Sequence, residues 1–247
     1  MTAPQKATES TPETAARKRL IHRLQALSGV VFSLFLVLHL LTTSAASAGN
    51  AAYDRVLAIL RAIYRPHPLV ELALVGIPAA IHITCALLRI IERRRAHVAA
   101  PSQPTMRVHR YSGYVLLLAF AGHVFATRFA PLFATGPTAT GKADFSFLAF
   151  SLTKFPAFFI PYYLALGAAG ALHLFIGLGL AAKILFPSQF NTRRARSVSW
   201  VFAGAFASAV VAGVSSMALH AASADPTRLS EWTALYQRYV PFAEAGH

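Results

Sequence analysis

Two stretches of the chain decide its fold: SGVVFSLFLVLH at residues 28–39 and SGYVLLLAFAGH at residues 112–123. Each starts with Ser-Gly, continues through nine mostly apolar residues and ends in a histidine. Each stretch is followed by a second, shorter motif in which five residues separate a glycine from a histidine. These motifs are GIPAAIH at 76–82 and GAAGALH at 167–173. The order of these motifs predicts a duplicated two-helix unit, at residues 20–97 and 105–187, followed by a fifth helix at 198–219.

The composition is that of a membrane protein. Hydrophobic residues make up 55% of the chain and charged residues 13%, whereas soluble domains carry roughly 25% charged residues. Apolar runs of this length suit helices of about 20 residues that cross a bilayer, and they are too long for barrel strands. We therefore expect an all-α membrane protein with a five-helix transmembrane domain over residues 20–222. The spans are predicted at 24–43, 69–91, 111–128, 157–186 and 198–219.

The net charge of +14 indicates orientation. Five spans place the N-terminus and the loops at 89–110 and 186–197 on one side. Together with Lys183 at the adjoining end of the fourth span, this side holds 15 of the 23 Lys and Arg residues and three of the nine acids. The positive-inside rule makes this the cytosol-like side, here called the inner side. The excess charge suits anionic headgroups. Nucleic-acid binding is not expected, because the chain has no basic soluble module.

The segments outside the spans carry weaker signals. Residues 1–19 are polar, resemble neither a signal nor a transit peptide, and are expected to be a disordered tail. Residues 53–65 are amphipathic, which is typical of an interfacial helix. Residues 130–156 show no clear periodicity, and residues 223–247 are expected to be an interfacial tail. The residues that carry these predictions are Val56, Ile59, Leu60 and Ile63 in the amphipathic segment and Trp232, Tyr236 and Tyr239 in the tail.

The spacing of the four intramembrane histidines predicts two levels. Ser28 and His39 are eleven residues apart, almost three helical turns, so they share a face with ~16 Å between them. His39 and His123 each follow a basic residue, Arg23 or Arg107, by 16 residues, which places both ~24 Å from the inner surface. His82 and His173 come within ~10–15 Å of that surface. We therefore expect an outer pair, His39 with His123, and an inner pair, His82 with His173.

Two levels with two histidines each are what bis-histidine ligation of two haem b groups needs. Small residues would leave room for the macrocycles: Ser28, Gly29, Ser112, Gly113, Gly76 and Gly167. Arg23 and Arg110 would neutralise propionates at the inner surface. Two alternatives stay open, namely histidines that only hydrogen-bond between helices and a different metal or a proton relay.

The other titratable residues of interest receive simpler predictions. Cys85, the single cysteine, excludes a disulfide within the chain and is expected to pack beside His82. Glu71 is expected at the interface near a span entrance, with a quinone-site role as the alternative. The remaining histidines are expected to be solvated or interfacial: His22, His67, His97, His109, His220 and His247.

Spans one and three share the pattern Arg, four residues, Ser-Gly, nine residues, His, which resembles the di-haem cytochrome b anchor of succinate dehydrogenase and fumarate reductase. In that family histidines from four helices hold two stacked haems. The resemblance implies the same role for the four histidines here. It also implies flavoprotein and iron–sulfur partner subunits, electron exchange with quinone, and the inner mitochondrial or a bacterial plasma membrane.

Three stretches over residues 20–185 are more similar to the mitochondrial Mcp-type adaptor family, the Mdm-ten-complementing transmembrane domain. They are YRPHPLVELALVGIPAAIH (64–82), RYSGYVLLLAFAGHVFATRFAPL (110–132) and FPAFFIPYYLALGAAGALHLFIG (155–177). That family sits in the mitochondrial outer membrane, acts in lipid homeostasis, and recruits a bridge-like Vps lipid-transfer protein through a Pro-x-Pro motif in its cytosolic N-terminal region. This N-terminus has isolated Pro4 and Pro12 in place of that motif.

From these resemblances and the histidine pattern we expect a protein of the Mcp type in the mitochondrial outer membrane, with a cytosolic N-terminus. It would contact membrane lipids, bind two haem b groups, and not be an enzyme by itself. The alternative is the cytochrome b anchor of a respiratory complex. A third possibility is a purely structural, lipid-facing scaffold.

Overall fold

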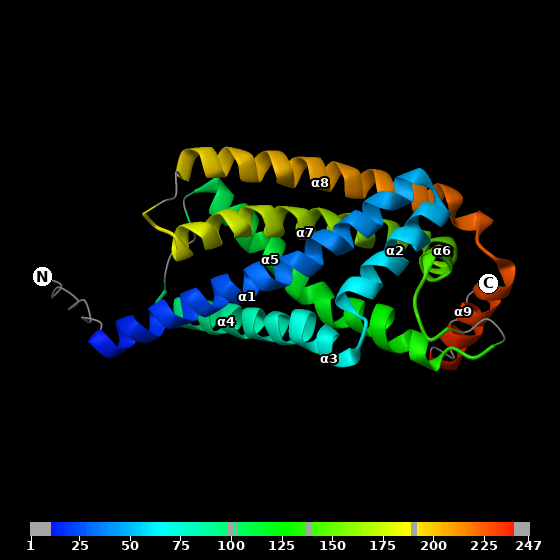
Figure 1. Cartoon of the computed structure of the whole chain (residues 1–247), viewed down its shortest axis with the longest axis horizontal. Helices are drawn as coiled ribbons and strands as arrows, with labels where there is room; N and C mark the ends of the chain where they lie inside the picture. Colours follow the sequence, from blue (N-terminus) through cyan, green and yellow to red (C-terminus); the bar gives the residue numbers. More distant parts are fainter. Residues whose placement is uncertain (1–10, 98–100, 102, 137–139, 189–191, 240–247) are drawn as a thin grey trace, which may run out of the picture.

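The computed structural model describes residues 11–97, 101, 103–136, 140–188 and 192–239. This part of the chain is almost entirely helical and contains no strand. Five of its helical segments are long and apolar enough to cross a membrane, which confirms the all-α, five-span prediction. They run side by side along the long axis of the molecule (Figure 1). The five segments are Pro12–Ala48, Pro68–Arg95, Pro104–Phe133, Pro156–Leu185 and Arg193–Ser223.

Helices α1, α7 and α8 pack closely together in the bundle. Helix α7 packs along α8, and α1 packs against α4, α7 and α8. At Gly213 the backbones of α8 and α1 approach so closely that a Cβ would collide with the carbonyl of Thr43. Buried aliphatic side chains of α1, α7 and α8, among them Leu40, Leu174 and Val210, fill the space between these helices. The five helices of the bundle are α1 (Pro12–Ala45), α4 (Ile77–Arg95), α5 (Pro104–Val124), α7 (Pro156–Leu185) and α8 (Thr192–His220).

Helix α1 begins at Pro12, inside the stretch 1–19 that was expected to be disordered, so the predicted boundary was wrong. Thr11 caps the helix by accepting a hydrogen bond from the Thr14 N–H at 3.4 Å. Proline at the first position and Glu13 in the first turn both favour a helix start. Residues 1–10 lie outside the described residues.

Two spans contain a short π-helical segment, and each lies one turn before a proline. The first, η2 (Leu72–Gly76), follows α3 (Pro68–Glu71) and precedes Pro78. The second, η3 (Phe125–Phe129), starts two residues after His123 and precedes Pro131. Proline lacks an N–H and clashes with the carbonyl four residues earlier, so the preceding turn widens.

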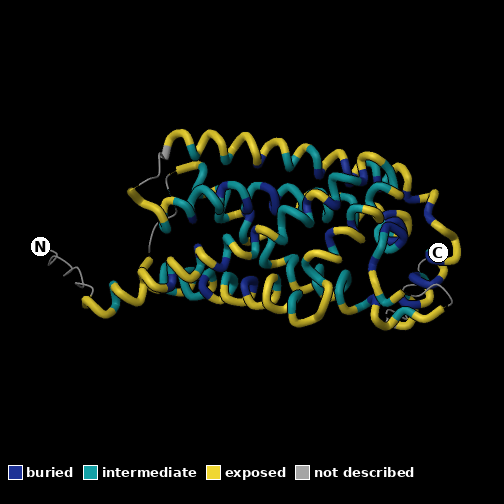
Figure 2. Tube along the Cα trace, in the orientation of Figure 1, coloured by how far each residue is buried: buried dark blue, intermediate teal, exposed yellow. Residues whose placement is uncertain are grey.

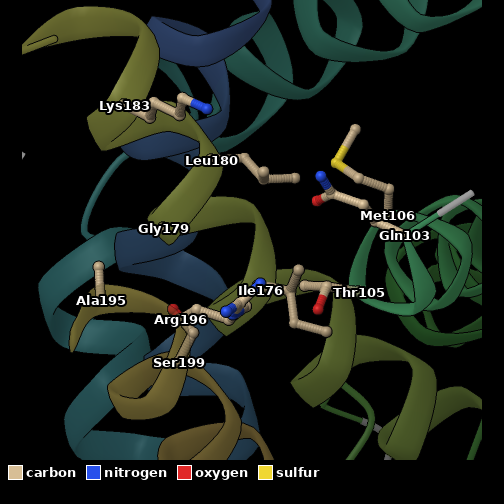
Figure 3. A pocket seen from close by; sticks show the side chains of 10 residues that line it. All are labelled: Gln103, Thr105, Met106, Ile176, Gly179, Leu180, Lys183, Ala195, Arg196 and Ser199. Carbon is tan, nitrogen blue, oxygen red and sulfur yellow. The ribbon is translucent and has the colours of Figure 1, made fainter. Parts of the chain in front are cut away.

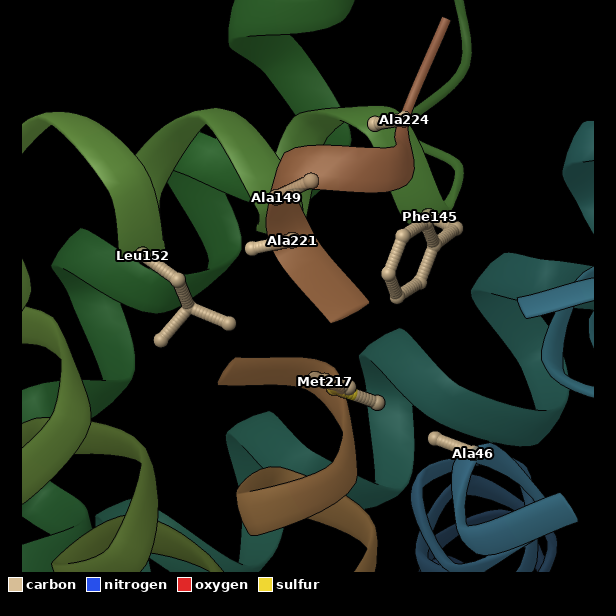
Figure 4. Close-up of a cluster of buried hydrophobic side chains, with 7 residues drawn as sticks. All are labelled: Ala46, Phe145, Ala149, Leu152, Met217, Ala221 and Ala224. Carbon is tan, nitrogen blue, oxygen red and sulfur yellow. The ribbon is translucent and has the colours of Figure 1, made fainter. Parts of the chain in front are cut away.

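Three shorter helices cover the outer end of the bundle, on the right of Figure 1. They are α2 (Asn50–Tyr64), α6 (Phe145–Lys154) and α9 (Pro226–Tyr239). Figure 4 shows that α6 meets the ends of α1 and α8 there through a cluster of buried side chains. The members of this cluster are Ala46, Phe145, Ala149, Leu152, Met217, Ala221 and Ala224.

The outer end corrects two predictions. Residues 130–156 contain α6, whose start is set by a contact distant in sequence, because the Asp54 carboxylate accepts the Phe145 N–H at 2.9 Å. Trp232 is not interfacial but only 2% exposed, and its Nε1–H donates to Ser146 Oγ at 2.8 Å. Arg228 of α9 forms an ion pair with Asp144, the residue before α6, and this pair connects the two helices. Arg228 also pairs with Glu231 of its own helix.

Helix α2 differs from prediction in how it presents its apolar residues. Leu57 and Leu60 face the protein and are buried, whereas Ile59 and Ile63 are more than half exposed. The surface of the bundle is similarly apolar, with Leu118 89% exposed and Val201 69% exposed, and Figure 2 shows exposed residues along the outer faces of the helices. Such a surface is stable in hydrocarbon and unfavourable in water.

Candidate functional site

The outer pair of histidines forms as predicted. His39 of α1 and His123 of α5 lie with ring centroids 5.8 Å apart and ring planes at 73°. Phe35, one turn before His39, stacks on the His39 ring with centroids 5.5 Å apart. Tyr64 of α2 contacts Phe35 edge-to-face at 5.0 Å. Among the described residues, no hydrogen bond reaches the ring nitrogens of either histidine. The outer pair is therefore held by packing alone.

The inner pair also forms as predicted, and hydrogen bonds orient it. His82 of α4 and His173 of α7 lie with centroids 6.1 Å apart and planes at 90°. The His82 Nδ1 atom is 3.0 Å from the Gln25 carbonyl oxygen, and the His173 Nδ1 atom is 3.1 Å from the His109 carbonyl oxygen. A carbonyl only accepts, so both Nδ1 atoms carry the proton and both Nε2 atoms keep a free lone pair.

The duplication explains why the two hydrogen bonds match. Gln25 precedes Ser28 by three residues, and His109 precedes Ser112 by three residues. Ser28 and Ser112 are buried, and each donates its hydroxyl proton back to its own helix, to the Gln25 and His109 carbonyls among others. The two serines were expected to leave room for a macrocycle. In the structure they hydrogen-bond to the carbonyls that orient the inner histidines.

Gly29 and Gly113 make room for the histidine rings themselves. A Cβ on Gly29 would lie 2.9 Å from His82 Nδ1, and a Cβ on Gly113 would lie 2.9 Å from His173 Cε1. Any side chain there would displace the inner imidazoles. The other two predicted glycines face elsewhere. Gly167 contacts Val210 of α8, and Gly76 contacts Leu72 of its own span.

His109 was expected to be solvated or interfacial, but its ring packs inside the bundle, so that prediction was wrong. Its ring stacks on His173, with centroids 4.1 Å apart and planes at 15°. Its Nδ1 is buried without a hydrogen-bond partner among the described residues. A Cβ on Gly177 would lie 3.0 Å from its Cε1. The signal in the sequence was its position, one turn before Ser112 and equivalent to Gln25.

The basic residues at the inner end are arranged differently from prediction. Arg23 is exposed, whereas Arg110 is half-buried and interacts electrostatically with Arg89 and Arg93 of α4. Arg89 donates to the Gln25 side-chain oxygen, so it lies directly beside the residue that holds His82. Sequence reasoning missed Arg89 as a site residue. It lies seven positions, close to two helical turns, after His82 and therefore on the same helix face.

Glu71 forms an ion cluster at the outer end. Its carboxylate lies 3.3 Å from Arg65 Nε and 3.0 Å from Arg128 Nε. Arg128 belongs to η3, five residues after His123, so this cluster lies near the outer pair. Cys85 is buried in α4, as expected.

The helix bundle contains two cavities, one beside the outer histidine pair and one at its inner end. One of about 320 Å³ lies beside the outer pair, and Gly122, whose missing Cβ would meet only open space, is part of its wall. Its lining residues are Leu118, Ala119, Gly122, His123, Ala126, Thr127, Phe147, Phe158, Phe159, Tyr162 and Tyr163. The other, of about 100 Å³, lies between the inner ends of α5, α7 and α8, and none of the four histidines lines it (Figure 3).

No protein-family model, characterised protein or solved structure matches this chain in comparisons with known proteins. The site is therefore interpreted from its own geometry.

Proposed function

We propose that the protein is a membrane-embedded b-type cytochrome with two haem groups, one held by His39 and His123 and the other by His82 and His173. The observation that carries this proposal is the pair of matched hydrogen bonds from His82 and His173 to backbone carbonyls. A metal-ligating histidine almost always donates its second ring N–H to a carbonyl or carboxylate, which fixes the tautomer and strengthens the ligand.

The number of ligands supports iron in a porphyrin over a bare metal ion. Each level offers two imidazoles, and the described residues contain no group of three or more His, Cys, Asp or Glu side chains placed to hold an ion. Structural zinc needs about four protein ligands. Haem iron brings four nitrogens of its own and takes only axial ligands from the protein.

The distances agree with axial ligation. A metal–imidazole bond is about 2.0–2.1 Å, so two histidines that held one metal ion would have ring centroids roughly 6 Å apart. The observed separations are 5.8 and 6.1 Å. Edge-to-face aromatic pairs also fall within ~4.5–7 Å, so the protonation of the rings is the more informative feature. The protonated Nδ1 and free Nε2 of both inner histidines favour ligation.

Bound haem supplies one-electron chemistry. The chain contributes the orientation of the imidazoles, the apolar surroundings that exclude water, and positive charge at the inner end. The two levels lie one behind the other along the bundle, which suits electron transfer across the membrane. We propose the Mcp-type setting, the mitochondrial outer membrane with lipid homeostasis as its context, on the similarity of the three stretches quoted above. Stoichiometric recovery of a flavoprotein and an iron–sulfur protein with this chain would favour the respiratory anchor instead.

Absorption spectra of the purified full-length protein, oxidised and reduced, test the proposal together with the ratio of haem to protein. We expect a ratio of about two in the wild type, one in a His39→Ala/His123→Ala variant and one in a His82→Ala/His173→Ala variant. The matched control is His97→Asn, since His97 is exposed and has a φ of 50° that asparagine tolerates. Haem-free wild-type protein, after expression with ample haem supply, would exclude the proposal.

A further inference from the structure

Three arginines gather at the inner end of the bundle, beside the inner histidine pair. Arg89 and Arg93 of α4 and Arg110 of α5 interact electrostatically with one another. All three are half-buried. Arg110 precedes Gly113 by three residues, so both lie on the face of α5 that contacts His173.

No ion pair neutralises this cluster among the described residues. Glu92 interacts electrostatically with Arg89, but its ion pair is with Arg17 of α1, at 3.5 Å. Among the described residues, no carboxylate lies within ion-pair distance of Arg89, Arg93 or Arg110. His22 of α1 also faces Arg89 and Arg93 and adds no negative charge. Three neighbouring, partly desolvated cations repel one another unless an anion joins them.

Arg89 also has an unused hydrogen-bond donor. One of its terminal nitrogens donates to the Gln25 side-chain oxygen, but its Nε is buried and has no acceptor among the described residues. Buried donors without a partner are rare in folded proteins. An acceptor from outside the described residues would satisfy this donor. Such a group would lie close to the inner histidine pair, because Arg89 contacts Gln25 and the Gln25 carbonyl binds His82.

We propose that Arg89, Arg93 and Arg110 form a binding site for an anionic oxygen group, a carboxylate or a phosphate. Guanidinium groups match both through paired, charge-assisted hydrogen bonds. Two sources supply this chemistry at the inner end of the bundle. One is the carboxylates of the inner haem, which rests on the proposed function. The other is the phosphate of an anionic lipid headgroup, which does not.

The first arm of the test uses the His39→Ala/His123→Ala protein, which keeps only the inner pair. Its affinity is measured for haem and for haem dimethyl ester, in which both carboxylates are blocked. We expect haem to bind at least ~10-fold more tightly than the ester, the factor of a charge-assisted contact. Arg89→Gln should weaken haem to the level of the ester and leave the ester unchanged. Arg89→Lys, which keeps the charge but loses the Nε donor, should fall between.

The second arm uses the His82→Ala/His173→Ala protein, which lacks the inner ligands. It is reconstituted with phosphatidylglycerol or phosphatidylcholine, and the lipid it retains is counted by native mass spectrometry. If a headgroup is the source, Arg89→Gln loses phosphatidylglycerol while haem and its ester bind equally well in the first arm. The matched control in both arms is Arg94→Gln, an exposed arginine on the same helix.

The anion site is overturned if Arg89→Gln behaves like Arg94→Gln in both arms. That result is distinct from failure of the proposed function, which would show as no haem uptake by the wild type. In that case the lipid arm still decides whether the site exists. Helix content by circular dichroism identifies any variant that fails to fold.

Discussion

The Nδ1 atom of His82 lies 3.0 Å from the backbone carbonyl oxygen of Gln25, across the contact between α4 and α1. The second unit repeats this contact between His173 and His109. Gln25 also accepts a hydrogen bond from Arg89 through its side chain. One residue therefore connects the inner histidine pair to the arginine cluster, and the glycines beside these contacts decide whether the rings fit.

Gly29→Ala and Gly113→Ala should each displace an inner histidine ring, because the new Cβ would lie 2.9 Å from it. Overpacking of this kind costs about 1–3 kcal/mol, so we expect loss of the inner haem with the outer haem retained. Haem content and spectra of the purified variants measure this. Gly122→Ala is the control, since its Cβ would meet open space. Equal haem loss in all three variants would show that the glycines act only through helix stability.

His109→Gln should keep both haems but release the inner one faster. The backbone carbonyl that binds His173 remains, whereas the stacked ring at 4.1 Å is lost. An aromatic contact is worth about 0.5–1.5 kcal/mol, which corresponds to a roughly 2- to 13-fold faster release. Transfer of haem to an excess of a soluble apo-haem protein follows the rate. A release rate equal to that of the wild type would mean that the ring adds nothing to the site.

Trp232→Ala should loosen the outer end without affecting the histidine pairs. The indole is 2% exposed, donates to Ser146 and contacts Phe147 edge-on at 5.2 Å. Truncating a buried tryptophan costs about 3–5 kcal/mol. We expect earlier proteolysis between α8 and α9 and a lower melting temperature, with unchanged haem content. Ala234→Gly, at an exposed position of the same helix, weakens the helix by about 1 kcal/mol without removing a core contact and should have the smaller effect.

The outer end should also lose stability as the pH rises. Burial raises the pKa of Asp54, while the Phe145 N–H opposes the shift by binding the carboxylate. With the pKa raised in the folded state, the folded protein binds more protons than the unfolded one above pH ~3.9. Stability is then highest below that pH and falls as the pH rises through the folded pKa. Asp54→Asn should flatten this dependence, measured as melting temperature against pH. A wild-type profile that rises with pH over this range would contradict the assignment.

The two ends of the bundle should be accessible from opposite sides of the membrane. In a Cys85→Ser background, a cysteine introduced at Lys18 should react with an impermeant maleimide from the cytosol-like side. A cysteine at Ala234 should react only from the other side. Both positions are exposed. Lys18 belongs to the first turns of α1 and Ala234 to α9, and Figure 1 shows the start of α1 and helix α9 at opposite ends of the molecule. Labelling of both from one side would refute the five-span topology.

The sequence by itself determined the number of spans, the duplication and the pairing of the histidines by depth. The number of spans and the depth of each histidine follow from the thickness of the hydrocarbon layer and the rise of 1.5 Å per helical residue. Neither quantity depends on how the helices pack against one another. For the same reason His39 could be matched with His123, and His82 with His173, before any contact between helices was known.

Only the tertiary structure decided what the neighbouring residues do. Gly29 lies against the His82 ring, whereas Gly167 lies against Val210 of α8, although both glycines precede a histidine in similar motifs. Arg89 lies at the inner pair while Arg23 is exposed, and α6 starts where Asp54 of another helix accepts its first N–H. Such roles depend on how each helix is rotated about its axis and on what packs against it. Sequence spacing along a single helix carries no information about either.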